Sequence, residues 1–104
     1  IEPIKKLDPS WFGLPILINE NLKKKKNKFL DFLRNNGIET RPIISGNFLN
    51  QPSIKIYNLN QKNELFKNSQ KIEERGFFIG IHVEPITNEK LNLLESKLLK
   101  INEI

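Results

Sequence analysis

Three short apolar runs, each next to glycine or proline, limit the folds open to this chain of 104 residues. They are rich in β-branched and aromatic residues, which favour strands, and they cover Ser10–Ile18, Ile38–Ile44 and Phe77–Ile81. The first reads as a buried strand in which Gly13 and Pro15 mark a bulge or an edge. Pro42 lacks an amide donor, so the second should lie at an edge or end its pairing early.

Amphipathic stretches between these runs predict helices. Apolar residues at helical spacing indicate a helix over 21–36, with Gly37 placed for a left-handed cap. A second helix is expected over 63–75, capped by Gly76, and a third after the plausible N-cap Thr87. The third is supported by Glu89 in its first turn, the hydrophobic staple of Ile86 and Leu91, and the apolar stripe Leu91, Leu94, Leu98 and Ile101.

The segment from Ser45 to Lys62 has no clear period and is long for a connection inside a compact domain. We interpret it as a binding loop or an interface arm, in which Ser53–Tyr57 is a candidate short strand. The order of elements predicts one α+β domain over residues 1–104. We expect a two-layer sandwich, with a small mixed or antiparallel sheet and helices on one face.

Absences in the composition exclude several classes of site. Cysteine is absent, so the chain has no disulfide, thiolate metal site or cysteine nucleophile. No apolar run approaches the ~20 residues that cross a bilayer, so we expect a cytoplasmic domain without a membrane partner. Methionine is also absent and the first residue is Ile1, so we expect a piece of a longer chain.

The net charge of +5 and the lysine run between Leu22 and Lys28 raise the possibility of a nucleic-acid interface. However, the run falls within the first predicted helix, whose apolar side includes Phe29 and Leu33. Lysines there form the solvated face of an amphipathic helix, and we favour that interpretation.

The polar residues that follow the second strand are the main binding candidates. Arg41 has a fork of donors suited to a carboxylate or phosphate. Ser45, Gly46 and Asn47 offer backbone amides and a side-chain amide to an anion or a sugar hydroxyl. Pairing of Arg41 with Glu39 and an ordinary turn at "SGN" are the alternatives, and spacing alone does not separate them.

His82, the single histidine, follows the third strand. With Glu84 nearby it is a candidate acid or base, although hydrogen bonding to the backbone at a strand end is the commoner role. One histidine and one glutamate are too few ligands for a metal site. No phosphate loop, carboxylate pair or nucleophile–base pair is evident, so no catalytic residue is assigned.

The motifs resemble a known family. "SWFGLPI", a helix ending "NNGIETRPIISGN", then "QP" and "GFFIGIHVEPIT" are similar to the C-terminal small domain of the DegT/DnrJ/StrS family of pyridoxal-phosphate (PLP) sugar aminotransferases. Within it the chain most resembles the nucleotide-sugar 3-dehydratases of lipopolysaccharide biosynthesis, of the RfbH and ColD type. The resemblance covers about Ser10 to Leu99, and "IHVEP" departs from the shorter "VYPG" of related dehydratases.

The resemblance implies the aspartate-aminotransferase fold, a homodimer, and a CDP- or GDP-linked 4-keto-6-deoxyhexose as substrate. It places Arg41, Ser45, Gly46 and Asn47 at the substrate, with Trp11, Phe12 and Gly13 packed nearby, and we add His82 as a further substrate-binding candidate. PLP and the catalytic base, a histidine in the dehydratases and a lysine in the aminotransferases, would belong to a large domain outside these residues. The fragment alone is expected to be inactive and to bind no cofactor or metal. A sugar aminotransferase domain and a free-standing module that binds RNA or another polyanion remain the alternatives.

Overall fold

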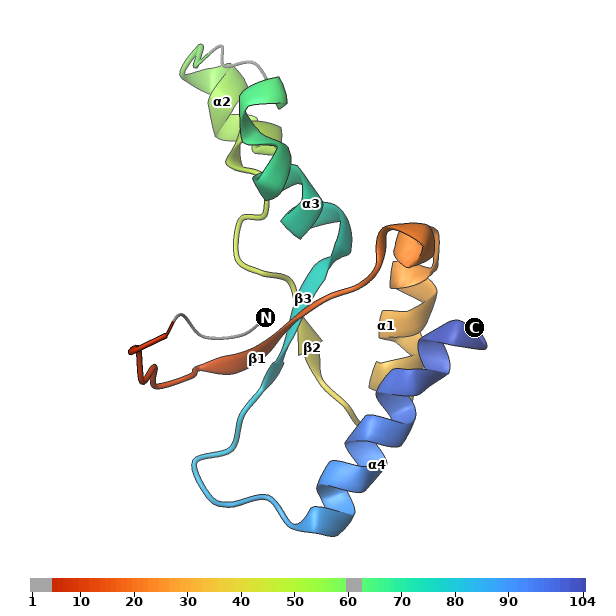
Figure 1. Ribbon diagram of the computed structural model, residues 1–104. Helices are drawn as coiled ribbons and strands as arrows, with labels where there is room; N and C mark the ends of the chain where they lie inside the picture. The colour runs from red at the N-terminus through yellow and green to blue at the C-terminus, as the bar shows by residue number, and fades with distance from the viewer. Residues whose placement is uncertain (1–4, 60–62) are drawn as a thin grey trace.

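The computed structural model describes residues 5–59 and 63–104. Within these ranges the sheet consists of β1 (Gly13–Leu17), β2 (Thr40–Arg41) and β3 (Gly76–Gly80). The strand order is β1-β3-β2 and both pairings are antiparallel, so β3 is central and its neighbours are edges (Figure 1). The predicted α+β class with a small antiparallel sheet is confirmed. Of the bulge or edge predicted for β1, the edge position is observed, and β2, the other edge strand, ends directly before Pro42.

Four α-helices lie within the described residues, two of them against the sheet. They are α1 (Lys26–Asn35), α2 (Pro52–Ile56), α3 (Lys67–Arg75) and α4 (Asn88–Leu99). Short 3-10 turns are η1 (Glu20–Lys25), η2 (Phe48–Asn50), η3 (Asn63–Phe66) and η4 (Lys100–Asn102). Helices α1 and α4 cover one face of the sheet, whereas α2 and α3 project beyond its end (Figure 1). We call the projecting segment, residues 45–59 and 63–75, the arm.

The core lies between β3 and α1. Phe77 and Ile79 of β3 pack in one cluster with Phe29 and Leu33 of α1. The Phe29 and Phe77 rings meet edge to face with centroids 6.2 Å apart. Alternate strand residues face opposite sides, so Phe78 belongs to the other face of the sheet, which α1 and α4 do not cover.

Two of the predicted capping signals, at Gly37 and Thr87, are confirmed. Gly37 has φ +77°, the left-handed conformation that glycine adopts without strain. The Thr87 hydroxyl accepts a hydrogen bond from the Lys90 amide at 3.4 Å, which begins α4 where the sequence predicts it. The staple between Ile86 and Leu91 stays a prediction.

Several segments differ from the sequence predictions, among them β2, which covers only Thr40–Arg41 of the predicted Ile38–Ile44. Strand β1 is shorter than Ser10–Ile18 and only partly buried. Leu17, on the face that α1 and α4 leave open, is 40% exposed. Ser53–Tyr57 was a candidate strand, but α2 begins at Pro52, whose fixed φ suits the first turn of a helix. The first predicted helix starts as η1, so its α-helical part begins at Lys26.

Gly76 ends α3 by a different geometry from the expected cap. It is extended, with φ −86° and ψ 145°, and is already the first residue of β3. A Cβ at this position would lie 2.5 Å from the carbonyl oxygen of Ile72, so close packing requires glycine here. The last part of the predicted 45–62 loop, residues 60–62, lies outside the described residues.

Candidate functional site

The predicted binding residues are divided between two hollows. A hollow of about 580 Å³ lies between the sheet and the start of α4, and we call it the β3–α4 hollow. Its walls include Phe12, Arg41, Phe78, His82, Ile86 and Lys90. A second hollow of about 470 Å³, the arm hollow, is lined by Gly46, Asn47, Phe48, Leu49, Ile54 and Phe66. The structure therefore brings Arg41 and His82 together and separates them from Gly46 and Asn47.

Arg41 reaches the β3–α4 hollow from β2, where it pairs in register with Phe78. Its Nε and Nη2 both donate to Oε1 of Glu39, at 3.0 and 2.8 Å. The pairing with Glu39 that the sequence left open is therefore observed. Both side chains are more than 60% exposed, 62% for Arg41 and 74% for Glu39, and an exposed pair contributes only about 0–1 kcal/mol. Such a pair is weak enough for an anionic ligand to compete for the guanidinium.

His82, Phe78 and Lys90 complete the lining of this hollow, and the last two were not predicted from the sequence. His82 is exposed and follows β3 by two residues, whereas its proposed partner Glu84 is not among the lining residues. Phe78 packs against Phe12 with ring centroids 5.9 Å apart. Lys90 lies in the first turn of α4, third after the cap Thr87. The N-cap motif at Thr87 could have indicated Lys90. A known helix start identifies the residues of the first turn, which lie beside the loop that precedes α4.

Asn47 has its polar groups engaged within the arm. It is 1% exposed, its side-chain oxygen accepts from the Leu49 amide at 3.2 Å, and its side-chain nitrogen donates to Gln70 Oε1 at 2.9 Å. Its backbone amide donates to Glu73 Oε2 at 2.7 Å. The ordinary-turn alternative therefore describes this structure, and substrate binding by Asn47 stays a prediction.

Gly46 and Ser45 frame the same turn. Gly46 has φ +57°, and a Cβ there would lie 2.9 Å from Cβ of Glu73, so both conformation and space require glycine. Its amide donates to the carbonyl of Ile43 at 2.9 Å. Ser45 is exposed and its carbonyl accepts from Gln51 Nε2 at 3.2 Å. The binding roles predicted for Ser45 and Gly46 stay predictions.

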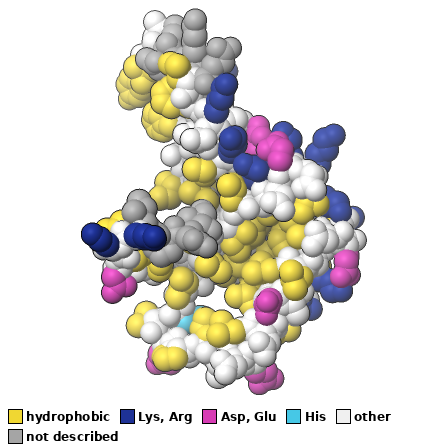
Figure 2. Space-filling model, viewed as in Figure 1, with side chains coloured by type: hydrophobic (Ala, Val, Ile, Leu, Met, Phe, Trp, Pro, Cys, Tyr) yellow, Lys and Arg dark blue, Asp and Glu magenta, His cyan; other side chains and the backbone are white. Residues whose placement is uncertain are grey.

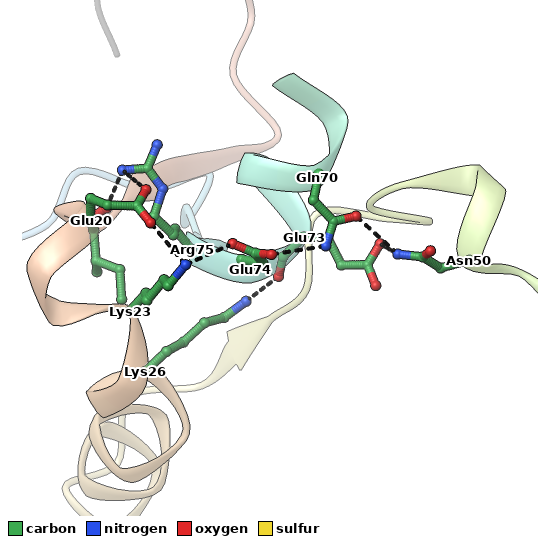
Figure 3. A network of polar contacts seen from close by, with 9 residues as sticks. Glu20, Lys23, Lys26, Asn50, Gln70, Glu73, Glu74 and Arg75 are labelled. Atoms are coloured by element: carbon green, nitrogen blue, oxygen red, sulfur yellow. Dashed lines mark hydrogen bonds and ion pairs between the residues drawn. The ribbon is translucent and has the colours of Figure 1, made fainter. Parts of the chain in front are cut away.

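A polar network ties this turn to the lysine run (Figure 3). Glu73 accepts from Asn50 Nδ2 at 3.0 Å through its carboxylate, and from Lys26 Nζ at 2.7 Å through its carbonyl. Burial lowers the pKa of Lys26 below its ordinary value. Lys26 therefore connects α1 to α3 through a hydrogen bond within the chain.

Lys23 belongs to the exposed part of this network. Its ammonium lies 2.9 Å from Glu20 and 3.5 Å from Glu74, and the hydrogen bond to Glu20 raises its pKa. The bond from Lys23 lowers the pKa of Glu20, and a bond from Gln70 lowers that of Glu74. Since Lys23 and Lys26 are both engaged within the chain, the run presents fewer free cations than its sequence suggests.

The described ranges contain neither a cluster of metal-binding side chains nor a helix able to span a membrane. Residues 5–59 and 63–104 hold no group of three or more histidine, cysteine, aspartate or glutamate side chains placed to bind a metal ion. In the same ranges no helix combines the length and the apolar character needed to cross a bilayer.

Comparison with known proteins matches residues 1–96 to the DegT/DnrJ/EryC1/StrS aminotransferase family. The lipopolysaccharide biosynthesis protein RfbH of Salmonella typhimurium is 34% identical over 96 residues, which are 92% of this chain and 22% of the relative. A GDP-4-keto-6-deoxy-D-mannose 3-dehydratase of Escherichia coli O55:H7 is 32% identical over 76 residues, 72% of this chain and 19% of that protein. Its counterpart from Yersinia pseudotuberculosis is 30% identical over 87 residues, 83% of this chain and 22% of that protein.

The chain thus spans about a fifth of the length of these relatives, at 19–22%. No solved structure gives a significant match. The family match covers nearly the whole chain and agrees with the small antiparallel sheet and its helices. The chain belongs to the DegT/DnrJ/EryC1/StrS aminotransferase family.

Proposed function

We propose that this chain is the substrate-contacting small domain of a PLP-dependent nucleotide-sugar 3-dehydratase in lipopolysaccharide deoxysugar biosynthesis. The substrate would be a CDP- or GDP-linked 4-keto-6-deoxyhexose. The observation that carries the proposal is the β3–α4 hollow, where Arg41 and His82 meet beside an aromatic pair. Similarity to RfbH and to two GDP-4-keto-6-deoxy-D-mannose 3-dehydratases supports the reaction class.

The residues of the two hollows do not fit PLP itself. A lysine that binds PLP is desolvated, and a carboxylate pairs with the pyridinium nitrogen. Lys90, the lysine of the β3–α4 hollow, is exposed, and the carboxylate of Glu39 is paired with Arg41. The cofactor, which supplies an electron sink when bound, would therefore be held by residues beyond this chain.

In this proposal the chain binds and orients the sugar nucleotide. Arg41 would exchange its weak contact with Glu39 for an anionic group of the substrate, and His82 would donate to or accept from a polar group nearby. Phe12, 81% exposed, and Leu17, 40% exposed, leave apolar surface open around β1. Figure 2 shows apolar side chains gathered on the arm and across the middle of the molecule, which favours packing against a larger domain or a dimer partner.

The test uses the enzyme that carries this chain together with its upstream residues. It is incubated with PLP and with CDP- and GDP-linked 4-keto-6-deoxyhexoses, and the product is analysed by mass spectrometry. Loss of the C3 hydroxyl supports the dehydratase. Formation of an amino sugar from an amino donor would assign the aminotransferase, and no reaction with either nucleotide would refute both.

Arg41→Lys provides the matched test of the site. It keeps the charge but removes the fork, so we expect kcat/KM to fall roughly 10–100-fold, as for the loss of a charge-assisted hydrogen bond. An unchanged kcat/KM would remove Arg41 from the substrate site. Circular dichroism shows whether the variant keeps its fold.

A further inference from the structure

Two residues of the lysine run contact the base of the arm. Lys26 Nζ donates to the carbonyl of Glu73 at 2.7 Å, across 47 positions of the sequence. Lys23 Nζ lies 3.5 Å from Oε2 of Glu74. Both contacts lead from the helical segment after β1 to the last turn of α3 (Figure 3). The lysine run therefore has a role within the chain that its charge alone does not indicate.

The end of α3 explains why donors are needed there. The last carbonyls of a helix have no amide partner within it, and they carry a partial negative charge that favours cations. The carbonyl of Glu73 accepts from the ammonium of Lys26. The carbonyl of Arg75 accepts from the amide of Ile18, directly after β1, at 3.2 Å. Residues outside the arm thus supply donors that α3 lacks in its own last turn.

Arg75 makes contacts in the opposite direction, from α3 to the segment after β1. Its side chain is 13% exposed, and its Nη1 lies 3.4 Å from both the carbonyl oxygen of Ile18 and Oε2 of Glu20. Glu20 also lies 2.9 Å from Lys23, so this carboxylate connects the two cations. We call the whole set the latch, which consists of Glu20, Lys23 and Lys26 on one side and Glu73, Glu74 and Arg75 on the other.

The second connection between the sheet and the arm, residues 42–44, is held differently. Its last residue, Ile44, is 89% exposed and has φ +28°, a conformation that β-branched residues rarely adopt. Gly46, which follows it in the arm, has φ +57°. Figure 1 shows α2 and the outer part of α3 extending away from the sheet, α1 and α4. The polar contacts that fix the direction of the arm are therefore concentrated at the end of α3.

We propose that the latch fixes the angle between the arm and the sheet, and that the arm turns about residues 44–46 and the α3–β3 junction when the latch is opened. Lys26 is its main contact, because the bond to Glu73 is short and partly buried, whereas the exposed Lys23–Glu74 pair contributes little. The latch also sets the direction in which the arm hollow faces. This inference rests on contacts within the chain and is independent of the proposed function.

The chain contains no cysteine, so two introduced cysteines can be labelled specifically. Lys55→Cys on α2 and Glu95→Cys on α4 are exposed positions for nitroxide labels, and pulsed electron paramagnetic resonance gives the distribution of distances between them. We expect one narrow distribution when the latch is intact. Lys26→Met keeps an apolar side chain but removes the donor, so the distribution should broaden roughly twofold and its mean should shift. Circular dichroism shows whether each variant keeps its helices.

Lys24→Met is the matched control, because Lys24 belongs to the same run, is exposed and has no hydrogen-bond or ion-pair partner among the described residues. Its distribution should equal that of the parent chain. Lys23→Met should broaden the distribution less than Lys26→Met does. An unchanged distribution in Lys26→Met would overturn the proposal, and so would equal broadening in Lys24→Met, since any loss of charge would then free the arm.

The enzyme that carries this chain provides the second measurement, which also decides the question if the labelled chain does not fold alone. Hydrogen exchange followed by mass spectrometry should be faster over residues 43–47 and 70–75 in Lys26→Met than in Lys24→Met. Exchange over residues 29–33 and 77–79 should be the same in both. Equal exchange everywhere would refute the latch. Faster exchange over the core segments as well would mean general destabilisation in place of a turning arm, and would refute it too.

Discussion

One distant residue, Glu73, holds the turn after β2 in place through hydrogen bonds that the local sequence does not predict. Glu73 Oε2 accepts hydrogen bonds from the backbone amide of the buried Asn47 at 2.7 Å and from Asn50 Nδ2 at 3.0 Å. Gly37 and Thr87 were predictable, because their roles depend on neighbours within a few residues. Glu73 was not, because it acts across 26 residues and nothing in "KIEER" marks it as the partner of a distant turn.

Replacing Glu73 by alanine leaves the buried Asn47 amide without an acceptor. An unsatisfied buried donor costs about 1–3 kcal/mol, so the free energy of unfolding should fall by that amount. Urea unfolding followed by circular dichroism measures it. Glu95→Ala, an exposed position on α4, is the control, and equal stability of the two variants would contradict the role of Glu73.

At the scale of elements, the helices follow from apolar spacing, whereas the arm does not. Helices α1 and α3 lie within their predicted ranges and α4 begins directly after its predicted N-cap, because their periodic residues contact the core or a neighbouring element. In the arm, Pro52 begins a short helix, although isoleucine and tyrosine at 54–57 favour a strand by composition. The β propensity of residues 54–57 does not decide their conformation, because this part of the arm is held against α3.

The N-cap of α4 gives a test at this scale. Thr87→Ala removes the acceptor of the Lys90 amide and should lower the free energy of unfolding by about 0.5–2 kcal/mol. The 3.4 Å bond is long, so the lower half of this range is expected. Thr87→Ser keeps the hydroxyl and should restore stability in the same denaturation experiment. Similar losses in both variants would show that the methyl group matters, not the cap.

The whole molecule is divided into two parts, the sheet with α1 and α4 and the projecting arm (Figure 1). The principal extents are 50 × 36 × 23 Å, and the arm accounts for the projection above the sheet (Figure 1). The candidate binding residues are divided between these two parts. Arg41 and Asn47 are only six positions apart in the sequence, but they line different hollows.

The polar network between η1 and α3 predicts how stability depends on pH. Glu20 and Glu74 have pKa values below the ordinary 4.5, so their contribution is present above that pH and is lost as pH falls through their lowered values. Both are exposed, so Tm should decrease only modestly from pH 6 to pH 3 on this account, and less at high salt. A Glu20→Gln and Glu74→Gln double variant should show a flatter profile; an identical profile would contradict the assignment.

The direct passage from α3 into β3 restricts how the gene can vary. Arg75 ends the helix and Gly76 begins the strand, so there is no connecting loop to absorb a change in length. One inserted codon at this point would slip the strand by one register position and turn Phe77 and Ile79 away from α1. Insertions and deletions should therefore be excluded from this junction during evolution, however freely the rest of the arm diverges.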